Sequence, residues 1–217
     1  MKILLYKEFV LTTPLLTFLF LAFTVMTFIP GYPILCGAFF VCFGIFQSYQ
    51  SGREDNDLLY TVLLPVQKSD AVKSKYAAAM VLQIIAFILF AIFTCLRMVF
   101  LSDAVVYTTN ALMGANLVFL AFVLLIFTAF NVVFIGGFFK TAYGFGKPFV
   151  MFIIVNFALI AIAETLHHLP GLEWMNALDF GNVLRQLRVL LAAVLFYFSA
   201  TAVSCRISEK RFEKIDL

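Results

Sequence analysis

The chain has 217 residues, of which 64% are hydrophobic and 28 are phenylalanine, against 15 basic and 12 acidic residues. A soluble core in a chain of this size cannot hold so much apolar surface, so the composition excludes soluble enzymes and soluble binding domains and predicts a multi-pass membrane protein. The net charge of +3 is small and spread along the chain, which favours contact with anionic lipid headgroups over nucleic acid.

Long apolar runs between short charged segments predict an all-α integral membrane protein, because a helix pairs its backbone groups internally and so can lie in lipid. About 20 apolar residues suffice for one crossing. We therefore predict a single transmembrane domain over residues 1–217, with six spans near 11–29, 33–49, 76–101, 109–139, 148–169 and 189–205.

The first two spans are short and are separated only by Pro30-Gly31-Tyr32-Pro33, a sequence typical of a tight turn. They predict a helical hairpin, with a re-entrant pair as the alternative. The fourth stretch has about 31 residues and would be roughly 46 Å long as one helix, which exceeds the hydrocarbon thickness. We expect it to tilt, to extend beyond the membrane, or to break near Asn131 or Gly136-Gly137.

Basic residues are divided unequally between the two sides of the predicted membrane domain. One side carries only Arg97, Arg185 and Arg188. The other carries the remaining twelve: Lys2, Lys7, Arg53, Lys68, Lys73, Lys75, Lys140, Lys147, Arg206, Lys210, Arg211 and Lys214. Because cytoplasmic segments are enriched in lysine and arginine, both termini are predicted to be cytoplasmic.

The largest predicted cytoplasmic segment is 50–75, between the second and third spans. It predicts a short amphipathic helix at the membrane surface, ended by Pro65. Its apolar face would hold Leu58, Leu59, Val62 and Leu63, and its polar face Glu54, Asp57 and Thr61. The segment is either an ordinary interfacial loop or a docking element for a cytoplasmic partner. Its acidic residues favour docking, since loops on this side are usually basic.

This segment carries a family pattern. Acidic residues are followed by Leu58-Leu59, then by Leu64-Pro65-Val66, Val72 and Ser74-Lys75-Tyr76, which leads straight into a span. The pattern resembles that of permease subunits of bacterial type-2 ATP-binding-cassette transporters. The charged residues before the first span and the six-span plan are also similar.

The resemblance implies that the 50–75 segment couples the chain to a separate ATPase subunit, which would hold ATP and Mg. The implied coupling residues are Arg53, Glu54, Asp55, Asp57, Leu58, Leu59 and Thr61. Residues Met1–Val10 would form an interfacial elbow helix. Two permeases, identical or homologous, would assemble with two ATPases in the bacterial cytoplasmic membrane. Small permeases of this family often export amphipathic peptides, bacteriocins or drugs, and the short outer loops fit export of an amphipathic or hydrophobic cargo.

The chain contains no GxxxxGK[ST] sequence, so we expect no ATP hydrolysis and no bound cofactor in this polypeptide. The nearest glycine cluster is Gly144-Phe145-Gly146-Lys147-Pro148, which has the wrong spacing and reads as a cytoplasmic turn.

Ionisable residues inside spans are costly and therefore mark candidate sites. Near the outer side we expect Glu164 to form ion pairs that hold helices together or act as a gate, with Arg97, Arg185 or Arg188 as partners. Amides within spans usually bond between helices, and a role along a cargo pathway is the alternative. The amides concerned are Gln83, Asn116, Asn131 and Asn156.

Glu164-Thr165-Leu166-His167-His168 also permits an intramembrane enzyme, because a glutamate and histidines three and four residues on share a helix face. No metal site is expected, since the spacing is not HExxH and no third ligand stands out.

A membrane scaffold or immunity subunit that moves no cargo is a further alternative. Residues Pro170–Asn182 predict a short interfacial helix with Trp174 at headgroup level.

Overall fold

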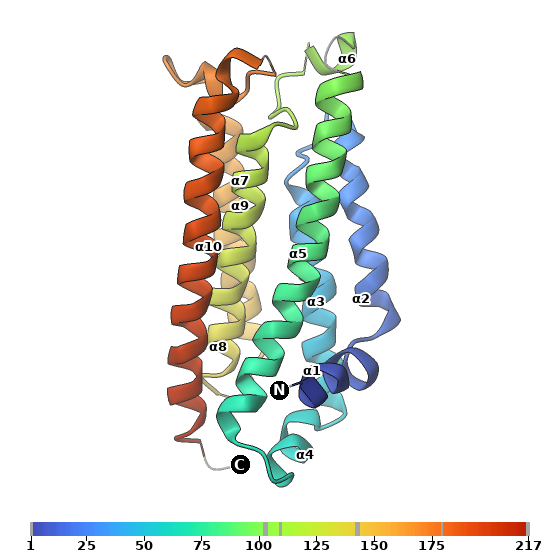
Figure 1. The fold of residues 1–217 in the computed structure, drawn as a ribbon, viewed down its shortest axis with the longest axis vertical. Helices are drawn as coiled ribbons and strands as arrows, with labels where there is room; N and C mark the ends of the chain where they lie inside the picture. Colours follow the sequence, from blue (N-terminus) through green and yellow to red (C-terminus); the bar gives the residue numbers. More distant parts are fainter. Residues whose placement is uncertain (1, 102–103, 109, 142–143, 179, 216–217) are drawn as a thin grey trace.

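The computed structural model describes residues 2–101, 104–108, 110–141, 144–178 and 180–215. Every regular element in these ranges is helical, as predicted. The helices form an elongated bundle with both termini, α1 and α4 at one end and α6 at the other (Figure 1). We call these the basal end and the distal end.

The chain begins with α1 (Lys2–Lys7) and the π-helix η1 (Glu8–Thr12), which lie across the base of the bundle (Figure 1). It then bends by 91° into α2 (Leu15–Leu19) and the 3-10 helix η2 (Phe20–Phe28), which run along the bundle. Pro14 stands at the bend in an extended conformation and has no N–H to continue the first helix. The predicted elbow is therefore a separate element lying across the spans.

The helix α3 (Cys36–Glu54) packs against α2 and η2, so the predicted hairpin is present. Gly31 in the connecting turn has φ +70°, a conformation that glycine adopts at no steric cost. A side chain on Gly44 would lie 2.5 Å from Cβ of Phe20, so the glycine permits this close approach. The hydroxyl of Thr17 donates to the carbonyl of Gly44 at 2.8 Å across the same contact.

The next elements are the short helix α4 (Asp57–Leu63) at the base, then α5 (Lys68–Phe100) and α6 (Val105–Thr108). The helix α5 begins eight residues before the predicted span at 76, because the basic stretch before the span is already helical. It therefore runs from the basal end up the bundle (Figure 1).

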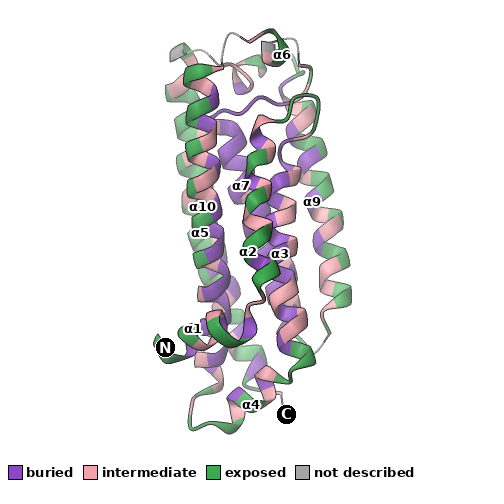
Figure 2. Cartoon of the chain, turned by 90° about the vertical axis from the view of Figure 1, so that its right-hand side faces the viewer, coloured by how far each residue is buried: buried purple, intermediate pink, exposed green. Residues whose placement is uncertain are grey.

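The most deeply buried element comprises α7 (Leu117–Ala129), the π-helix η3 (Phe130–Ile135) and α8 (Gly136–Phe138). Its sequence is hydrophobic on all sides, which is typical of a central helix, and 83% of its apolar stretch is buried. Figure 2 shows this burial inside a more exposed outer ring. The fourth span is shorter than predicted, because residues 110–116 are not helical. The helix then runs without interruption from Leu117 to Phe138, with a π-helical segment over Phe130–Ile135, so the expected break near Asn131 or Gly136-Gly137 does not occur.

The chain ends with α9 (Gly146–Leu166) and the long helix α10 (Val183–Phe212), which both lie at the periphery. Between them, the interfacial helix predicted over Pro170–Asn182 is replaced by two short 3-10 turns, η4 (Glu173–Met175) and η5 (Phe180–Asn182). Trp174 in η4 is half-buried, and its carbonyl accepts a hydrogen bond from the side chain of Gln186.

Four helices in the described ranges are long and apolar enough to cross a membrane: α5, α7–α8, α9 and α10. The bent pair formed by α1–η1 and α2–η2 raises this number to five if it counts as one span. The helix α3 is not among them, because its last eight residues, from Gln47 onward, are mostly polar. Six crossings and cytoplasmic termini therefore stay predictions, although both termini do lie at the same end.

Candidate functional site

A buried ion cluster joins three elements at the basal end. Lys7 Nζ lies 2.6 Å from Asp57 Oδ1, and Lys75 Nζ lies 2.9 Å from Asp57 Oδ2. Lys75 also binds Glu8 Oε2 at 2.9 Å, and Lys7 lies 3.1 Å from Glu8 Oε1. The four residues thus link α1–η1, α4 and α5.

The cluster is closed to solvent and balanced in charge. Its side chains are only 5–15% exposed, and two lysines face two carboxylates. Thr61 adds a hydroxyl that accepts from Lys7 at 2.7 Å and donates to the carbonyl of Asp57 at 2.7 Å. Burial alone would raise the pKa of Asp57, but Lys75 and Lys7 outweigh it and hold the pKa below its ordinary value. Such a cluster fixes relative positions more than it stabilises the fold, because desolvation offsets much of the attraction.

Local sequence explains how α4 reaches this position. Asn56 has φ 52°, a left-handed conformation that asparagine tolerates, and it turns the chain sharply between α3 and α4. Gly52 on α3 packs against η1: a Cβ there would lie 2.8 Å from Cγ2 of Thr12. Pro65 follows α4 and prevents its continuation.

The predicted coupling residues separate into two groups. Asp57, Leu58 and Thr61 face inward, and Leu59 is half-buried. Arg53, Glu54 and Asp55 are exposed at the turn between α3 and α4. The predicted division of faces holds for Leu58, which is buried, and for Glu54, which is exposed. It fails for Asp57 and Thr61, which are enclosed by the cluster, and Leu63 is 74% exposed.

The outward side of α4 is apolar. Tyr60 is 63% exposed, and Leu64 just beyond the helix is 52% exposed. Together with Leu63 they form a small hydrophobic surface at the basal end, which we call the α4 tip. Exposed apolar groups of this kind, rimmed by polar residues, are typical of protein contacts.

At the distal end, the candidate residues bind backbone groups. Glu164 Oε2 accepts from the N–H of Met113 at 2.7 Å, and His167 Nε2 lies 3.2 Å from the carbonyl of Ala111. Both therefore hold the non-helical segment 110–116 against α9. Within the described ranges, no ion pair joins Glu164 to an arginine, so the expected pairing is not found. Glu164 instead binds the backbone of the 110–116 segment.

The three distal arginines differ in their surroundings. Arg97 is buried, donates to the carbonyl of Thr27 at 2.6 Å and lies 4.1 Å from the ring centre of Tyr107. Arg185 and Arg188 are exposed on α10. Across the described residues, no three His, Cys, Asp or Glu side chains gather as metal ligands. A gating role for these residues stays a prediction.

Comparison with known families places this arrangement in context. A family model described as ABC-2 family transporter protein matches residues 3–213, which is nearly the whole chain.

The chain belongs to the ABC-2 family.

This confirms the resemblance to type-2 permeases that was based on the 50–75 segment. ABC-2 proteins are membrane components of transporters, are not themselves catalytic, and normally work with an ATPase subunit. No curated protein and no solved structure matches the chain.

In this ABC-2 protein, the amides within the bundle have different surroundings. Asn116 caps α7 by accepting from the N–H groups of Val118 and Phe119. Asn131, in the π-helix η3, exchanges two 2.9 Å hydrogen bonds with Gln83 of α5. Asn156 in α9 is fully buried, and neither atom of its amide has a partner within the described ranges.

The network around Asn131 extends to α10. Asn131 donates to Thr201 at 3.1 Å, and Tyr197 donates to Gln83 at 2.7 Å. Nearer the base, the hydroxyl of Tyr76 lies 2.9 Å from Ser204 Oγ. These bonds fasten α5, η3 and α10 together, as predicted for span amides. Lys75 and Tyr76 are adjacent in the Ser74-Lys75-Tyr76 motif, but Lys75 belongs to the ion cluster and Tyr76 to the hydrogen-bond network. The motif alone did not indicate this division.

Proposed function

We propose that this ABC-2 chain is the membrane subunit of an ATP-driven exporter and that α4 docks the ATPase subunit. The observation that carries the proposal is the dual environment of α4. Asp57 on its inner side is bound to Lys7 and Lys75, while the α4 tip is exposed at the base. One short helix thus combines a surface for a partner with ionic contacts to two further elements.

This arrangement suggests how movement passes into the bundle. A partner that displaces α4 must either break the buried cluster, which costs several kcal/mol, or carry α1–η1 and α5 along with it. Joint movement of α4, α1–η1 and α5 is favoured as long as the ion pairs of the cluster stay intact. Because α5 contacts η2 and α7 and α10, its displacement changes the packing of the helices that line any pathway.

Orientation, assembly and cargo are inferred from the ABC-2 family and from the distribution of charge. The basal end faces the cytoplasm of a bacterial cell, in agreement with its twelve basic residues. Two permeases, identical or homologous, assemble with two ATPases that carry ATP and Mg. Short distal segments leave little surface for an external receptor, which favours export. The apolar bundle, rich in phenylalanine, suits an amphipathic or hydrophobic cargo such as a peptide, bacteriocin or drug.

The test is co-purification of the ATPase with the tagged full chain in mild detergent. Replacing Leu63 with aspartate places a charge on the α4 tip and should lower the retained ATPase by about 30-fold, as for loss of a central apolar contact. The matched control is Leu184→Asp at the distal end, where Leu184 is 71% exposed against 74% for Leu63. Equal retention by both variants would overturn the docking assignment.

Transport separates this function from a scaffold. Reconstituted vesicles that hold the chain and its ATPase should accumulate a fluorescent amphipathic peptide or dye when ATP is supplied. ATP turnover without cargo movement, tested across peptides and drugs, would instead support the scaffold alternative.

A further inference from the structure

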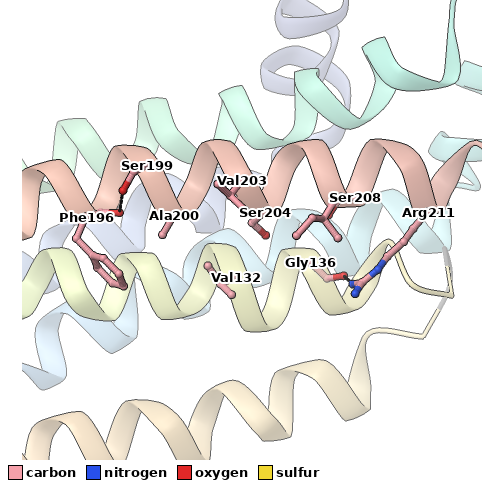
Figure 3. A pocket seen from close by; sticks show the side chains of 10 residues that line it. Val132, Gly136, Phe196, Ser199, Ala200, Val203, Ser204, Ser208 and Arg211 are labelled. Atoms are coloured by element: carbon pink, nitrogen blue, oxygen red, sulfur yellow. Dashed lines mark hydrogen bonds between the residues drawn. The ribbon is translucent and has the colours of Figure 1, made fainter.

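An open groove lies between α10 and the η3–α8 segment in the basal half of the bundle. It has a volume of about 420 Å³, within the range of small-ligand sites. Its walls are largely apolar and include Val132, Phe196 and Val203 (Figure 3) as well as Ile207. Val132 and Val203 are exposed, so the groove opens toward the surroundings of the bundle.

Small residues create the groove. Gly136 contributes no side chain, and a Cβ there would lie 3.0 Å from Ser204 Oγ. Ala200, Ser204 and Ser208 lie on the facing side of α10, one helical turn apart. Both serine hydroxyls are engaged by Tyr76 at 2.9 and 3.0 Å. The floor is therefore fixed to α5, and its polar groups are already satisfied.

Arg211 gives the groove a positive basal end. It is exposed, and its Nη1 donates to the carbonyl of Gly136 at 3.4 Å (Figure 3). The nearby Glu209 is instead paired with Lys73 at 3.5 Å. Among the described residues no carboxylate forms an ion pair with Arg211. The guanidinium, which has five N–H donors, thus keeps most of them available.

The length of the groove matches one membrane leaflet. From Phe196 to Arg211 the helix rises about 22 Å at 1.5 Å per residue. One leaflet contributes about 15 Å of hydrocarbon, so a groove of this length also reaches the headgroup layer. Its apolar part would lie in the acyl region and Arg211 at headgroup level.

We propose that this groove binds one anionic glycerophospholipid, with an acyl chain along α10 and the phosphate at Arg211. Basic pockets between helices at this depth suit anionic headgroups. A second copy of the chain is the competing occupant, but in a symmetric contact of two grooves no lining residue is a carboxylate that could pair with Arg211 of the other copy. Binding of lipid here needs no ATPase, so the proposal can be tested independently of transport.

The experiment measures lipid affinity of the purified full chain in detergent by native mass spectrometry. Phosphatidylglycerol is compared with phosphatidylcholine carrying the same acyl chains. We expect about five-fold tighter binding of phosphatidylglycerol, the contribution typical of one cation near an anionic surface. Arg211→Gln should remove this preference. Lys210→Gln, which removes the same charge from a neighbouring exposed residue outside the groove, should keep it.

A groove-filling variant tests the acyl part. Ala200→Trp should weaken binding of both lipids alike; should it fail to fold, the Arg211 and Lys210 pair still decides the headgroup question. Equal affinity for the two lipids would overturn the proposal, as would equal loss in the two charge variants. Oxidative cross-linking of Ala200→Cys chains into a dimer that the parent chain does not form would assign the groove to a second copy instead.

Discussion

Asp57 is the residue on which the basal cluster depends, since its two carboxylate oxygens each bind a different lysine. Glu8 binds the same two lysines from the other side. Removal of either carboxylate therefore leaves two buried cations facing one anion. This imbalance, more than the loss of any one contact, determines what substitution does.

Replacing Asp57 with asparagine should lower the free energy of unfolding by about 3 kcal/mol, the usual cost of leaving a buried charge without its partner. Thermal unfolding of the purified chain in detergent measures the effect. Asp55→Asn serves as the control, because Asp55 is exposed only two positions away. An equal change in the two variants would show that the cluster has no special role.

The same cluster predicts a pH dependence. Because the folded pKa of Asp57 lies below its ordinary value of 3.8, its contribution is present above that value and is lost as the pH falls through the folded pKa. The stability difference between the parent chain and Asp57→Asn should stay constant from pH 7 to about pH 5 and shrink below about pH 4. A difference that does not shrink in acid would contradict the assigned ionisation.

Asn156 presents the opposite case, a buried amide without partners in the described structure. Replacing it with leucine, whose side chain has the same number and branching of heavy atoms, should raise the free energy of unfolding by about 1–2 kcal/mol, because an unsatisfied polar group is removed. Asn131→Leu should lower it by a similar amount, since its bonds to Gln83 and Thr201 are lost. Destabilisation by Asn156→Leu would mean that the amide has a partner, such as a bound water molecule.

At the scale of elements, the elbow formed by α1 and η1 is held in place by a glycine contact as well as by ions. Gly52 of α3 lies against Thr12 so closely that an added Cβ would meet Cγ2 at 2.8 Å. It also lies near the cluster, since the same Cβ would be 3.7 Å from Lys75 Nζ. The position of the elbow thus depends on α3, whose polar last turns extend to the basal end.

Gly52→Ala should therefore destabilise the protein by about 1–3 kcal/mol through overpacking, although glycine to alanine within a helix is ordinarily stabilising. The double variant Gly52→Ala with Thr12→Ser removes the clashing methyl group and should recover most of the loss. A double-mutant cycle on unfolding midpoints measures this coupling. Additive effects would show that the elbow does not rest on Gly52.

Sequence patterns predicted the elements better than the contacts between them. Apolar runs identified each long helix, although hydropathy marks only the part of α5 from residue 76 onward and does not detect the helical basic stretch that begins at Lys68. Asn116 before an apolar run is a helix-start signal that could have shortened the fourth span. The cluster could not be predicted, because Lys7 and Asp57 are 50 positions apart and nothing local marks which of twelve basic residues is buried.

At the scale of the whole molecule, the bundle is polarised. The elbow, α4, the ion cluster and the positive end of the groove all lie toward the base. The distal end carries the short helix α6 and non-helical segments that Glu164, His167 and Gln186 bind. A polar network from Tyr76 to Tyr197 joins α5, η3 and α10 between them. This polarity fits an ATPase that acts from the basal end. The ion cluster would pass its movement to α5, and the hydrogen-bond network would keep α5, η3 and α10 together in the apolar part of the bundle.

If an ATPase binds the α4 tip, site-specific photo-crosslinking in intact cells should capture it there. A photoreactive amino acid at Leu63 should give an adduct that mass spectrometry identifies as an ABC ATPase, and the same probe at Leu184 should give none. No ATPase adduct at Leu63, or equal adducts at both positions, would show that the α4 tip is not the ATPase-binding surface.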